Sequence, residues 1–488
     1  MSVIDLVIIN PNPAKSIYQG LTDEYKAIET PIWAGMLAAG LRAKNHSVII
    51  IDAEAENLTN TLVLKRLETY KPRLVAIVVY GSHPSASTQI MPAAGELCRE
   101  IKNYYPELKT IMLGSHIAAL PLRTLKEEAC DYVAQGEGLY TLHALLQKNV
   151  NLRQVPGLVF RDGDDVLLNE RAPLISQGDL QVDLPSVAYD LLPMDKYRAH
   201  NWHCFDSIHE RMPYASIYTS LGCPFKCDFC CINVPFGGSS FRFWEPEFII
   251  QKFDELALKY QIKNIKIADE MFVLREDHFL KLCDLLIERN HGFNIWAYSR
   301  IDTVKPHHLA KLKKAGINWL VLGIESHSAH VRQGITKGKF TEADIVQTVR
   351  MIQDAGIRVL GNYIFGLPDD NHESMETTLK LAQELNCELA NFYCAMAYPG
   401  SKLFTQALEQ GLKLPASWDG YSQHSYVCEP LSTKFLSAKE VLAFRDEAWK
   451  RYHQSERYLK MIKEKFGEET HKHMLKLSKK NLKRKILE

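Results

Sequence analysis

One short stretch decides the fold of this 488-residue chain: Leu221-Gly-Cys-Pro-Phe-Lys-Cys-Asp-Phe-Cys230. It holds three cysteines in the spacing Cys-x3-Cys-x2-Cys, with Phe229 directly before the last one. Thiolates hold iron–sulfur clusters, and a site that leaves one metal position free of protein is typical of a catalytic rather than a structural centre. The spacing therefore predicts a 4Fe-4S cluster bound by Cys223, Cys227 and Cys230, with one iron left open.

Two plainer interpretations of these cysteines compete with the cluster. A zinc site would usually show a second Cys/His pair at metal spacing, whereas after Cys231 the next cysteine is Cys283, which stands alone. A group of buried, reduced cysteines is the other alternative. We expect Cys231 to pack in the core, because two adjacent residues cannot easily both face one cluster.

Composition indicates a globular protein of two or three domains, because 488 residues are too many for one ordinary core. The 58 Lys and Arg residues balance the 58 Asp and Glu residues, so no net field attracts nucleic acid or an anionic membrane. No apolar run approaches the roughly 20 residues that a membrane span needs. The 11 cysteines lack paired spacing, which argues against secretion. We therefore expect a reducing cytoplasm, which also suits an oxygen-sensitive cluster.

Residues 1–149 alternate apolar runs with amphipathic stretches, which predicts an α/β domain with a doubly wound, Rossmann-like parallel sheet. The expected strands are residues 3–9, 47–52, 74–80, 110–114 and 132–134. Ligands of such sheets bind beyond the carboxyl ends of the strands. Those ends carry small residues that let a large ligand approach the backbone, namely Gly81-Ser82-His83, Gly114-Ser115-His116 and Gly136-Glu137-Gly138.

Three further regions follow. Residues 150–213 are interpreted as a linker that contains a hairpin turning at Asp162-Gly163. Residues 214–402 contain six strand–helix units, with strands expected at 215–219, 265–268, 293–298, 319–324, 359–365 and 390–395. Residues 403–488 predict a small helical C-terminal cap, with an amphipathic helix from about Ser437 and a lysine-rich tail to which no role is assigned.

The cysteine triad and the polar residues that end these six strands resemble those of radical S-adenosylmethionine (SAM) enzymes. The resemblance implies a partial (β/α)6 barrel, in which the open iron chelates the amine and carboxylate of SAM. One electron then cleaves SAM to a 5′-deoxyadenosyl radical. The cofactor contacts that it implies are Phe229 and Gly366 for adenine, Asp269 and Glu270 for the amine, Arg300 for the carboxylate, and Glu325 and Ser326 for the ribose. Ser299, directly before Arg300 at the end of the third strand, is a further expected cofactor contact.

Glu270 and Arg300 are the candidate catalytic residues. A carboxylate suits an ammonium group, and Glu270 is preferred to its neighbour Asp269 for that role. The arginine guanidinium can fork onto a carboxylate, which a lysine does poorly.

The N-terminal half resembles the cobalamin-binding domain that precedes one class of radical SAM enzymes. The resemblance also rests on Ala34-Gly-Met-Leu-Ala-Ala-Gly-Leu and Asn45-His-Ser-Val-Ile-Ile-Ile-Asp52. It implies that the three glycine-containing strand ends contact cobalamin: Gly81, Ser82, His83, Gly114, Ser115, His116, Gly136, Glu137 and Gly138. The Asp-x-His-x-x-Gly motif that supplies an axial histidine elsewhere is missing, so we expect no histidine on cobalt. A flavodoxin-like domain with an empty or different site is the alternative.

Together these resemblances imply a cobalamin-dependent radical SAM enzyme, most simply a methyltransferase acting on an unactivated carbon of a small molecule, lipid or natural-product intermediate. An external electron donor such as flavodoxin or ferredoxin is expected. Non-methylating chemistry with the same cofactors, such as oxidative cyclisation or rearrangement, is the first rival. A cobalamin sensor with a vestigial barrel is the second. A methylthiotransferase would need another cysteine triad in its N-terminal domain, where only Cys98 and Cys130 lie.

Overall fold

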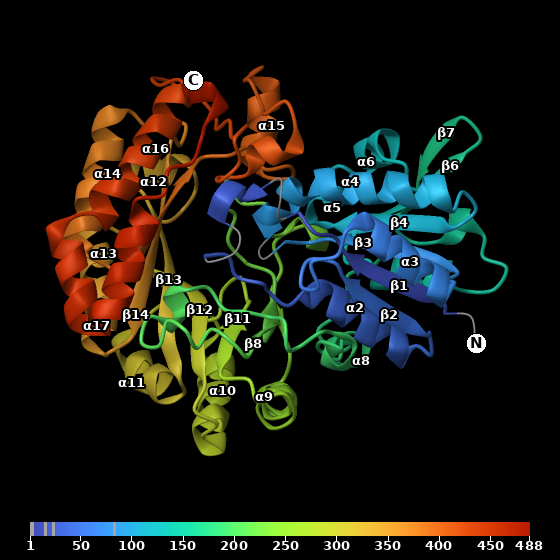
Figure 1. The fold of residues 1–488 in the computed structure, drawn as a ribbon, viewed down its shortest axis with the longest axis horizontal. Helices are drawn as coiled ribbons and strands as arrows, with labels where there is room; N and C mark the ends of the chain where they lie inside the picture. Colours follow the sequence, from blue (N-terminus) through green and yellow to red (C-terminus); the bar gives the residue numbers. More distant parts are fainter. Residues whose placement is uncertain (1–3, 14–16, 22–24, 82–83) are drawn as a thin grey trace.

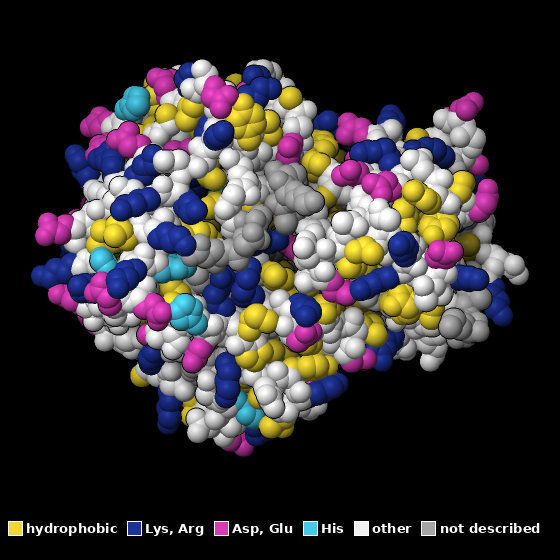
Figure 2. All heavy atoms as spheres, in the orientation of Figure 1, with side chains coloured by type: hydrophobic (Ala, Val, Ile, Leu, Met, Phe, Trp, Pro, Cys, Tyr) yellow, Lys and Arg dark blue, Asp and Glu magenta, His cyan; other side chains and the backbone are white. Residues whose placement is uncertain are grey.

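The computed structural model describes residues 4–13, 17–21, 25–81 and 84–488. Two α/β units lie side by side, with the N-terminal one at the right of Figure 1 and the second one, followed by the C-terminal helices, at the left. No helix of the described residues is both long enough and apolar enough to cross a membrane. Acidic and basic side chains are interspersed over most of the face shown in Figure 2, as expected from the balanced composition.

The N-terminal sheet has seven strands in the order β2-β1-β3-β4-β5-β6-β7, and β1 to β5 are parallel. Successive side chains of a strand point to opposite faces, so Leu6 and Ile8 pack with α2 while Val7 and Ile9 pack with α3 and α4. Because both faces are covered, the central strand β3 is buried throughout. This confirms the predicted doubly wound domain. Its elements are β1 (Leu6–Asn10), α2 (Ile32–Ala43), β2 (Val48–Asp52), α3 (Asn60–Tyr70), β3 (Leu74–Val79), α4 (Ser87–Tyr104), β4 (Lys109–Gly114), α5 (Ser115–Ala119), α6 (Pro121–Glu127), β5 (Tyr132–Ala134) and α7 (Leu139–Leu145).

The predicted hairpin is present, but it belongs to this sheet rather than to a separate linker. Strands β6 (Leu158–Asp162) and β7 (Asp165–Leu168) pair with each other across the turn, and β6 pairs antiparallel with β5. The N-terminal sheet therefore extends past residue 149. The chain then runs through the short helix α8 (Leu180–Asp183) to the second unit.

The second sheet has six parallel strands in sequence order, from β8 at one edge to β15 at the other. The edge strands β8 and β15 do not pair with each other, so the sheet is an open barrel, as the resemblance implied. Its strands are β8 (Tyr214–Ile217), β11 (Asn264–Ile267), β12 (Asn294–Arg300), β13 (Ile317–Glu325), β14 (Arg358–Phe365) and β15 (Leu389–Cys394). Its helices are α9 (Pro246–Tyr260), α10 (Glu276–Arg289), α11 (Pro306–Lys314), α12 (Ala329–Gly334), α13 (Glu342–Asp354) and α14 (His372–Leu385).

The connector packs at the amino ends of the barrel strands, and the C-terminal region covers the open edge at β15. The ring of Trp202 in the connector packs against those of Trp296 and Trp319 at the amino ends of the strands. The distances between ring centroids are 5.2 and 5.3 Å. At the open edge, the amide of Gln423 exchanges hydrogen bonds of 2.9 and 3.0 Å with the backbone of Cys394 in β15. The C-terminal helices are α15 (Lys402–Glu409), α16 (Ala438–His453) and α17 (Glu456–Ser478).

A buried ion pair joins the two units. Strands β9 (Ser220–Leu221) and β10 (Arg242–Phe243) pair antiparallel on either side of the cysteine stretch, and Arg242 of β10 donates 2.8 Å to Glu137 in the loop after β5. Each of these two side chains is 6% exposed. Both side chains also bind the backbone of Ile175. Arg242 donates to the Ile175 carbonyl at 2.6 Å, and Glu137 accepts from the Ile175 N–H at 2.9 Å. These bonds fix the end of the N-terminal sheet against the second unit.

Removing one member of this pair should destabilise the protein strongly, because Arg242 would remain buried without its counter-charge. We expect Glu137→Ala to lower the free energy of unfolding by about 3 kcal/mol or more, measured by chemical denaturation. The matched control is Glu127→Ala, which breaks the exposed Arg123–Glu127 pair and should change it by about 0.5 kcal/mol or less. Equal effects of the two substitutions would contradict this role of Glu137.

Candidate active site

The three predicted ligands lie on the loop that follows β8 and β9, at the carboxyl end of the open barrel. Gly222 begins the loop with φ +86°, and a Cβ there would come within 2.5 Å of the Ser240 carbonyl oxygen. A side chain at this position is therefore excluded. Cys223, Cys227 and Cys230 are free and keep part of their surface exposed, while Cys231 is buried. The Cys231 sulfur lies 3.8 Å from the Ser85 hydroxyl of the N-terminal unit, so it points away as predicted.

The spacing of the three sulfurs disfavours a single zinc ion. Two thiolates on one tetrahedral zinc lie about 3.8 Å apart, because each Zn–S bond is about 2.3 Å long. In the described part of the chain the three sulfurs are not all within 4.8 Å of one another. An iron–sulfur cluster needs wider spacing, since each thiolate binds a different iron. The donor set therefore fits a cluster with one iron that no protein thiolate reaches.

Two polar residues that sequence reasoning missed hold the cysteine loop. The side chain of Asn233 accepts from the Cys223 N–H at 3.1 Å and donates to its carbonyl at 2.8 Å. Asp228 accepts bonds of 2.8 Å from both Thr336 and Lys402, which lie on two different elements. The only sequence signal for either was its position within or directly after the cysteine stretch.

The two acidic residues after β11 differ in their availability. Asp269 is 1% exposed and accepts bonds of 2.5 to 2.6 Å from Thr219 and Ser220, so its carboxylate braces the chain at the end of β8. Burial nevertheless raises the pKa of Asp269 to about 6. Glu270 accepts from the Gly222 N–H at 3.0 Å, and burial raises its pKa to about 8. Of the pair, Glu270 is the one free to bind an ammonium group.

The end of β12 holds one hydroxyl without a hydrogen-bond partner among the described residues and one guanidinium that is already bonded to the protein. Ser299 is buried, and its hydroxyl has no hydrogen-bond partner among the described residues. Arg300 uses its fork on Asp302, with two bonds of 2.8 Å, and also donates 2.5 Å to the Lys337 carbonyl. Its Nη1 lies 3.7 Å from the Cys227 sulfur. In this arrangement Arg300 cannot give a carboxylate of SAM the predicted pair of parallel bonds.

The remaining predicted barrel-end residues are also tied to the protein. Glu325 forms a buried ion pair with Lys337, and the hydroxyl of Ser326 lies 3.2 Å from that of Thr378. Gly366 has φ +78°, and a Cβ there would lie 2.4 Å from Val441 of α16, so packing alone requires glycine. The side chains of Glu325 and Ser326 are thus used structurally, although their strand ends still surround the cysteine loop.

Phe229 remains partly exposed beside the cysteines. It packs against the apolar groups at the ends of β14 and β15, and the Lys337 Nζ lies 6.0 Å from its ring centroid. A flat aromatic face next to the cysteine loop is suited to stack on adenine, as the resemblance implied.

The carboxyl edge of the N-terminal sheet offers unused polar groups. The hydroxyls of Tyr80, Ser87 and Ser115 are buried and make no hydrogen bond of good geometry within the described residues, although Tyr80 and Ser115 face each other. Gly114 has φ +144°, and a Cβ there would lie 1.9 Å from the Val79 carbonyl oxygen. Buried groups without partners are rare, so this edge fits a large polar cofactor.

A cavity of about 210 Å³ lies along the same edge, between the end of β5 and the chain that follows the cysteine loop. Gly138, Arg171 and Phe236 are among the residues that line it. Its volume is below that of a typical small-molecule site, so it could receive only part of a large cofactor.

Not every predicted cobalamin contact is available. The carboxylate of Glu137 is used by Arg242 and Ile175, so its predicted contact with the cofactor is replaced by a structural role. Gly136 and Gly138 keep the positive φ values, +102° and +90°, that shape the loop around it. Gly81 lies two residues after β3, and a Cβ there would come within 2.5 Å of the Ala86 side chain. Ser82 and His83 lie outside the described residues.

His116 is buried and makes its contacts within the protein. Its Nδ1 lies 3.2 Å from the Thr88 hydroxyl, and the ring of Trp418 meets it edge to face at 4.5 Å between centroids. Burial, assisted by Arg123, lowers the pKa of His116 to about 3, so the ring is neutral.

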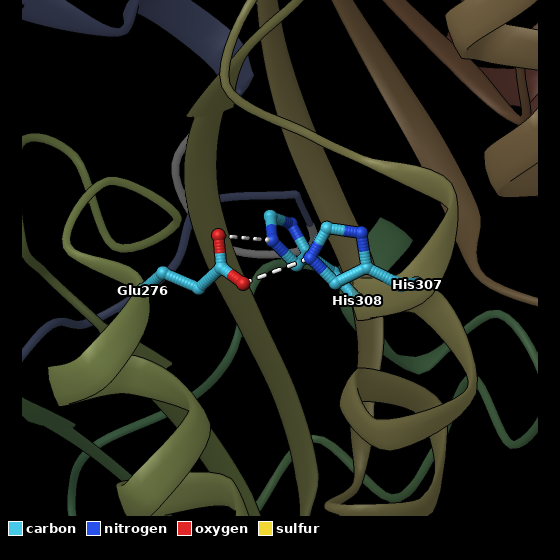
Figure 3. A group of neighbouring side chains, drawn as sticks. All are labelled: Glu276, His307 and His308. Atoms are coloured by element: carbon cyan, nitrogen blue, oxygen red, sulfur yellow. Dashed lines mark hydrogen bonds and ion pairs between the residues drawn. The ribbon is translucent and has the colours of Figure 1, made fainter.

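A separate group of metal-type side chains joins the N-termini of α10 and α11 (Figure 3). Glu276 pairs with His307 at 2.8 Å and with His308 at 3.3 Å. The Nδ1 of His308 accepts the Lys305 N–H at 3.1 Å in a helix cap, which places the proton of the neutral ring on Nε2. That nitrogen then has no lone pair for a metal, so the group is explained as helix capping.

Comparisons with known proteins identify a family for each of the two α/β units. Residues 217–382 match the family model of the radical SAM superfamily, and residues 18–146 match that of the B12 binding domain. An uncharacterised methyltransferase of Pyrococcus horikoshii is 31% identical over 396 residues, which cover 80% of this chain and 81% of the relative. The chain belongs to the radical SAM superfamily and carries a B12-binding domain ahead of its radical SAM domain.

Two further proteins are similar at lower identity. The anaerobic magnesium-protoporphyrin IX monomethyl ester cyclase of Cereibacter sphaeroides is 24% identical over 90% of this chain and 68% of its own length. The structure of TsrM from Kitasatospora setae, a radical SAM methyltransferase, superposes with a TM-score of 0.66 at 17% identity, covering 86% of this chain and 81% of TsrM. At that identity the likeness to TsrM concerns the fold.

The cysteine loop predicts a clear contrast between neighbouring cysteines. After anaerobic reconstitution, the parent should hold about four irons per chain with charge-transfer absorption, and the triple variant Cys223/Cys227/Cys230→Ala should lose both. Cys231→Ser should keep both, because its sulfur faces Ser85. A full cluster in the triple variant would refute the ligand assignment.

The cobalamin edge predicts cobalt without a histidine ligand. Protein loaded with cobalamin should give a Co(II) electron paramagnetic resonance spectrum without nitrogen superhyperfine splitting. His116→Ala should leave this spectrum unchanged, because the imidazole is held by its hydrogen bond to Thr88 and its contact with the Trp418 ring. Nitrogen splitting that disappears in His116→Ala would show that the ring rotates onto cobalt.

Proposed function

We propose that this protein is a cobalamin-dependent radical SAM methyltransferase that acts on an unactivated carbon. One observation carries the proposal: the cysteine loop and the carboxyl edge of the N-terminal sheet touch, with Cys231 3.8 Å from Ser85. Cys231 directly follows the proposed ligand Cys230, and Ser85 lies in the short 3-10 helix η2 (Pro84–Ala86) that follows β3. The proposed sites for a radical and for a methyl donor would therefore adjoin, as methylation of one carbon requires.

The cofactors and the protein divide the work. When bound, SAM at the cluster supplies a 5′-deoxyadenosyl radical, and cobalamin supplies the methyl group. Glu270 is proposed to bind the amine of SAM, because its carboxyl group has one N–H partner and is close to the cysteine loop. The free hydroxyl of Ser299 is proposed to bind the carboxylate, and Phe229 to stack on adenine.

The backbone at Gly114, Gly136 and Gly138, with the hydroxyl of Ser115, is proposed to hold cobalamin. Ser115 is buried without a hydrogen bond of good geometry, and at Gly136 the nearest atom to the missing Cβ is 3.6 Å away, which leaves room for a ligand beside the backbone.

We further propose an external one-electron donor of the flavodoxin or ferredoxin type and a cytoplasmic location. Lys226 lies on the cysteine loop itself and is exposed, which suits an acidic donor. All 11 cysteines are free thiols in the structure, in keeping with a reducing compartment.

Oxidative cyclisation is the second candidate. It is favoured by the similarity to the magnesium-protoporphyrin cyclase, which extends over 90% of this chain. Methylation is preferred because the relative at 31% identity, whose alignment covers 81% of its own length, is named a methyltransferase.

Product analysis distinguishes the candidates. Reconstituted protein is incubated anaerobically with a reductant, SAM labelled in its methyl group, and fractions of a small-molecule and lipid extract. Methylation predicts labelled product, with S-adenosylhomocysteine and 5′-deoxyadenosine each formed once per methyl transferred. Cyclisation predicts 5′-deoxyadenosine without S-adenosylhomocysteine, and a sensor predicts neither. The triple cysteine variant controls for cleavage that does not depend on the cluster.

A further inference from the structure

Two buried cations act on Cys227, one of the three proposed cluster ligands: Arg300 through a hydrogen bond and Lys337 through its electrostatic attraction. The Arg300 Nη1 lies 3.7 Å from the Cys227 sulfur, and Lys337, which is paired with Glu325, adjoins the same loop with its Nζ 6.0 Å from the Phe229 ring centroid. Arg300 is 4% exposed and Lys337 is 6% exposed. Within the described residues, Cys227 is the proposed ligand whose sulfur receives a hydrogen bond from a charged side chain.

The guanidinium of Arg300 is held rigidly against the sulfur. Asp302 binds its fork, the Lys337 carbonyl accepts a third bond, and the ring of Phe225 lies 3.8 Å from the guanidinium carbon. These contacts use Nε and Nη2, and the remaining nitrogen, Nη1, is the one that faces Cys227. Arg300 therefore presents its positive edge to the sulfur and its carboxylate partner to the opposite side.

The ammonium of Lys337 is placed by an irregular strand end. The pairing of β13 with β14 shifts register between Gly323 and Glu325, and Glu325 adopts φ +64°. A non-glycine residue in that region is strained, so the surrounding contacts must hold it there. Gly323 leaves the space that the pair occupies, since a Cβ there would come within 2.6 Å of both the Glu325 carboxylate and the Lys337 Nζ.

Cations at a ligand sulfur stabilise the reduced form of a cluster, because reduction adds one negative charge to it. Hydrogen bonds to the sulfurs, net charge and solvent exposure set the reduction potential of iron–sulfur clusters. Burial strengthens the effect, since little water screens the charges.

We propose that Arg300 and Lys337 are positioning residues that raise the reduction potential of the cluster through Cys227. This inference rests on the proposed function, because it requires the cluster at the three cysteines. In the step concerned, an external donor of the flavodoxin or ferredoxin type loses one electron, and the oxidised cluster gains it. The two cations ease that transfer before SAM is cleaved.

The test removes the Lys337 ion pair without leaving a lone buried charge. In the double variant Lys337→Met/Glu325→Gln, iron content and the reduction potential are measured, the latter by a redox titration followed by electron paramagnetic resonance. At the midpoint potential of the parent, we expect the ratio of reduced to oxidised cluster to fall at least threefold. For a one-electron couple this is a shift of about 28 mV to more negative potential.

The matched control is a second buried Lys–Glu pair far from the cysteines. Lys266 and Glu29 lie 2.6 Å apart, and the Lys266 ammonium lies over the ring of Trp296. Trp296 is four residues before Arg300 on β12, which is about 13 Å along the strand. Lys266→Met/Glu29→Gln removes the same charges, and we expect the potential of the parent.

The outcomes separate this proposal from the proposed function. A parent that holds no cluster would overturn both. Full iron content with an unchanged potential in the Lys337 double variant, or equal shifts in both double variants, would overturn the tuning role alone. If the Lys337 double variant does not retain iron, Lys337→Gln is compared with Lys337→Arg. The potential should fall only in the first, and equal potentials would overturn the proposal.

Discussion

The strands that carry the candidate site residues are parallel in both large sheets, so their carboxyl ends are the places where a ligand can bind. This constraint decides where every candidate site residue lies. The buried Glu137–Arg242 pair then sets the edge of one sheet against the other, and the contact of Ser85 with Cys231 joins the two candidate sites directly. Because each edge alone offers half of the required chemistry, the function depends on how the two edges are fixed together.

The charged residues around the cysteine loop are paired, and this explains their unexpected positions. A buried ion pair adds little net stability, since desolvation offsets the attraction between its members. Its value lies in placement: the Arg300–Asp302 and Glu325–Lys337 pairs each hold a cation beside the loop without adding net charge to the interior. The same pairing removes Arg300 and Glu325 from the direct cofactor contacts that sequence similarity suggested.

The sequence predicted the architecture well because its signals are local. Strand-like runs of three to seven residues identified the parallel strands of both large sheets, and three cysteines within eight residues identified the loop. Side-chain partners were not predictable, because they come from distant segments: Glu137 and Arg242 are 105 residues apart, and Lys337 is 110 residues after Cys227. The hairpin was recognised from its turn, but its pairing with β5 depends on the folded sheet.

Glu270 links the cysteine loop to the proposed SAM site. Its carboxyl group accepts the N–H of Gly222, the residue before the first cysteine, so any group bound by Glu270 lies next to the cluster loop. Burial raises its pKa to about 8, so it is mainly protonated at neutral pH while no cation is near. An arriving ammonium group would favour the charged form and lower this pKa, with loss of the proton. The proposed site therefore carries little unpaired charge until an ammonium group binds, and the cost of burying the carboxylate falls when that partner is present.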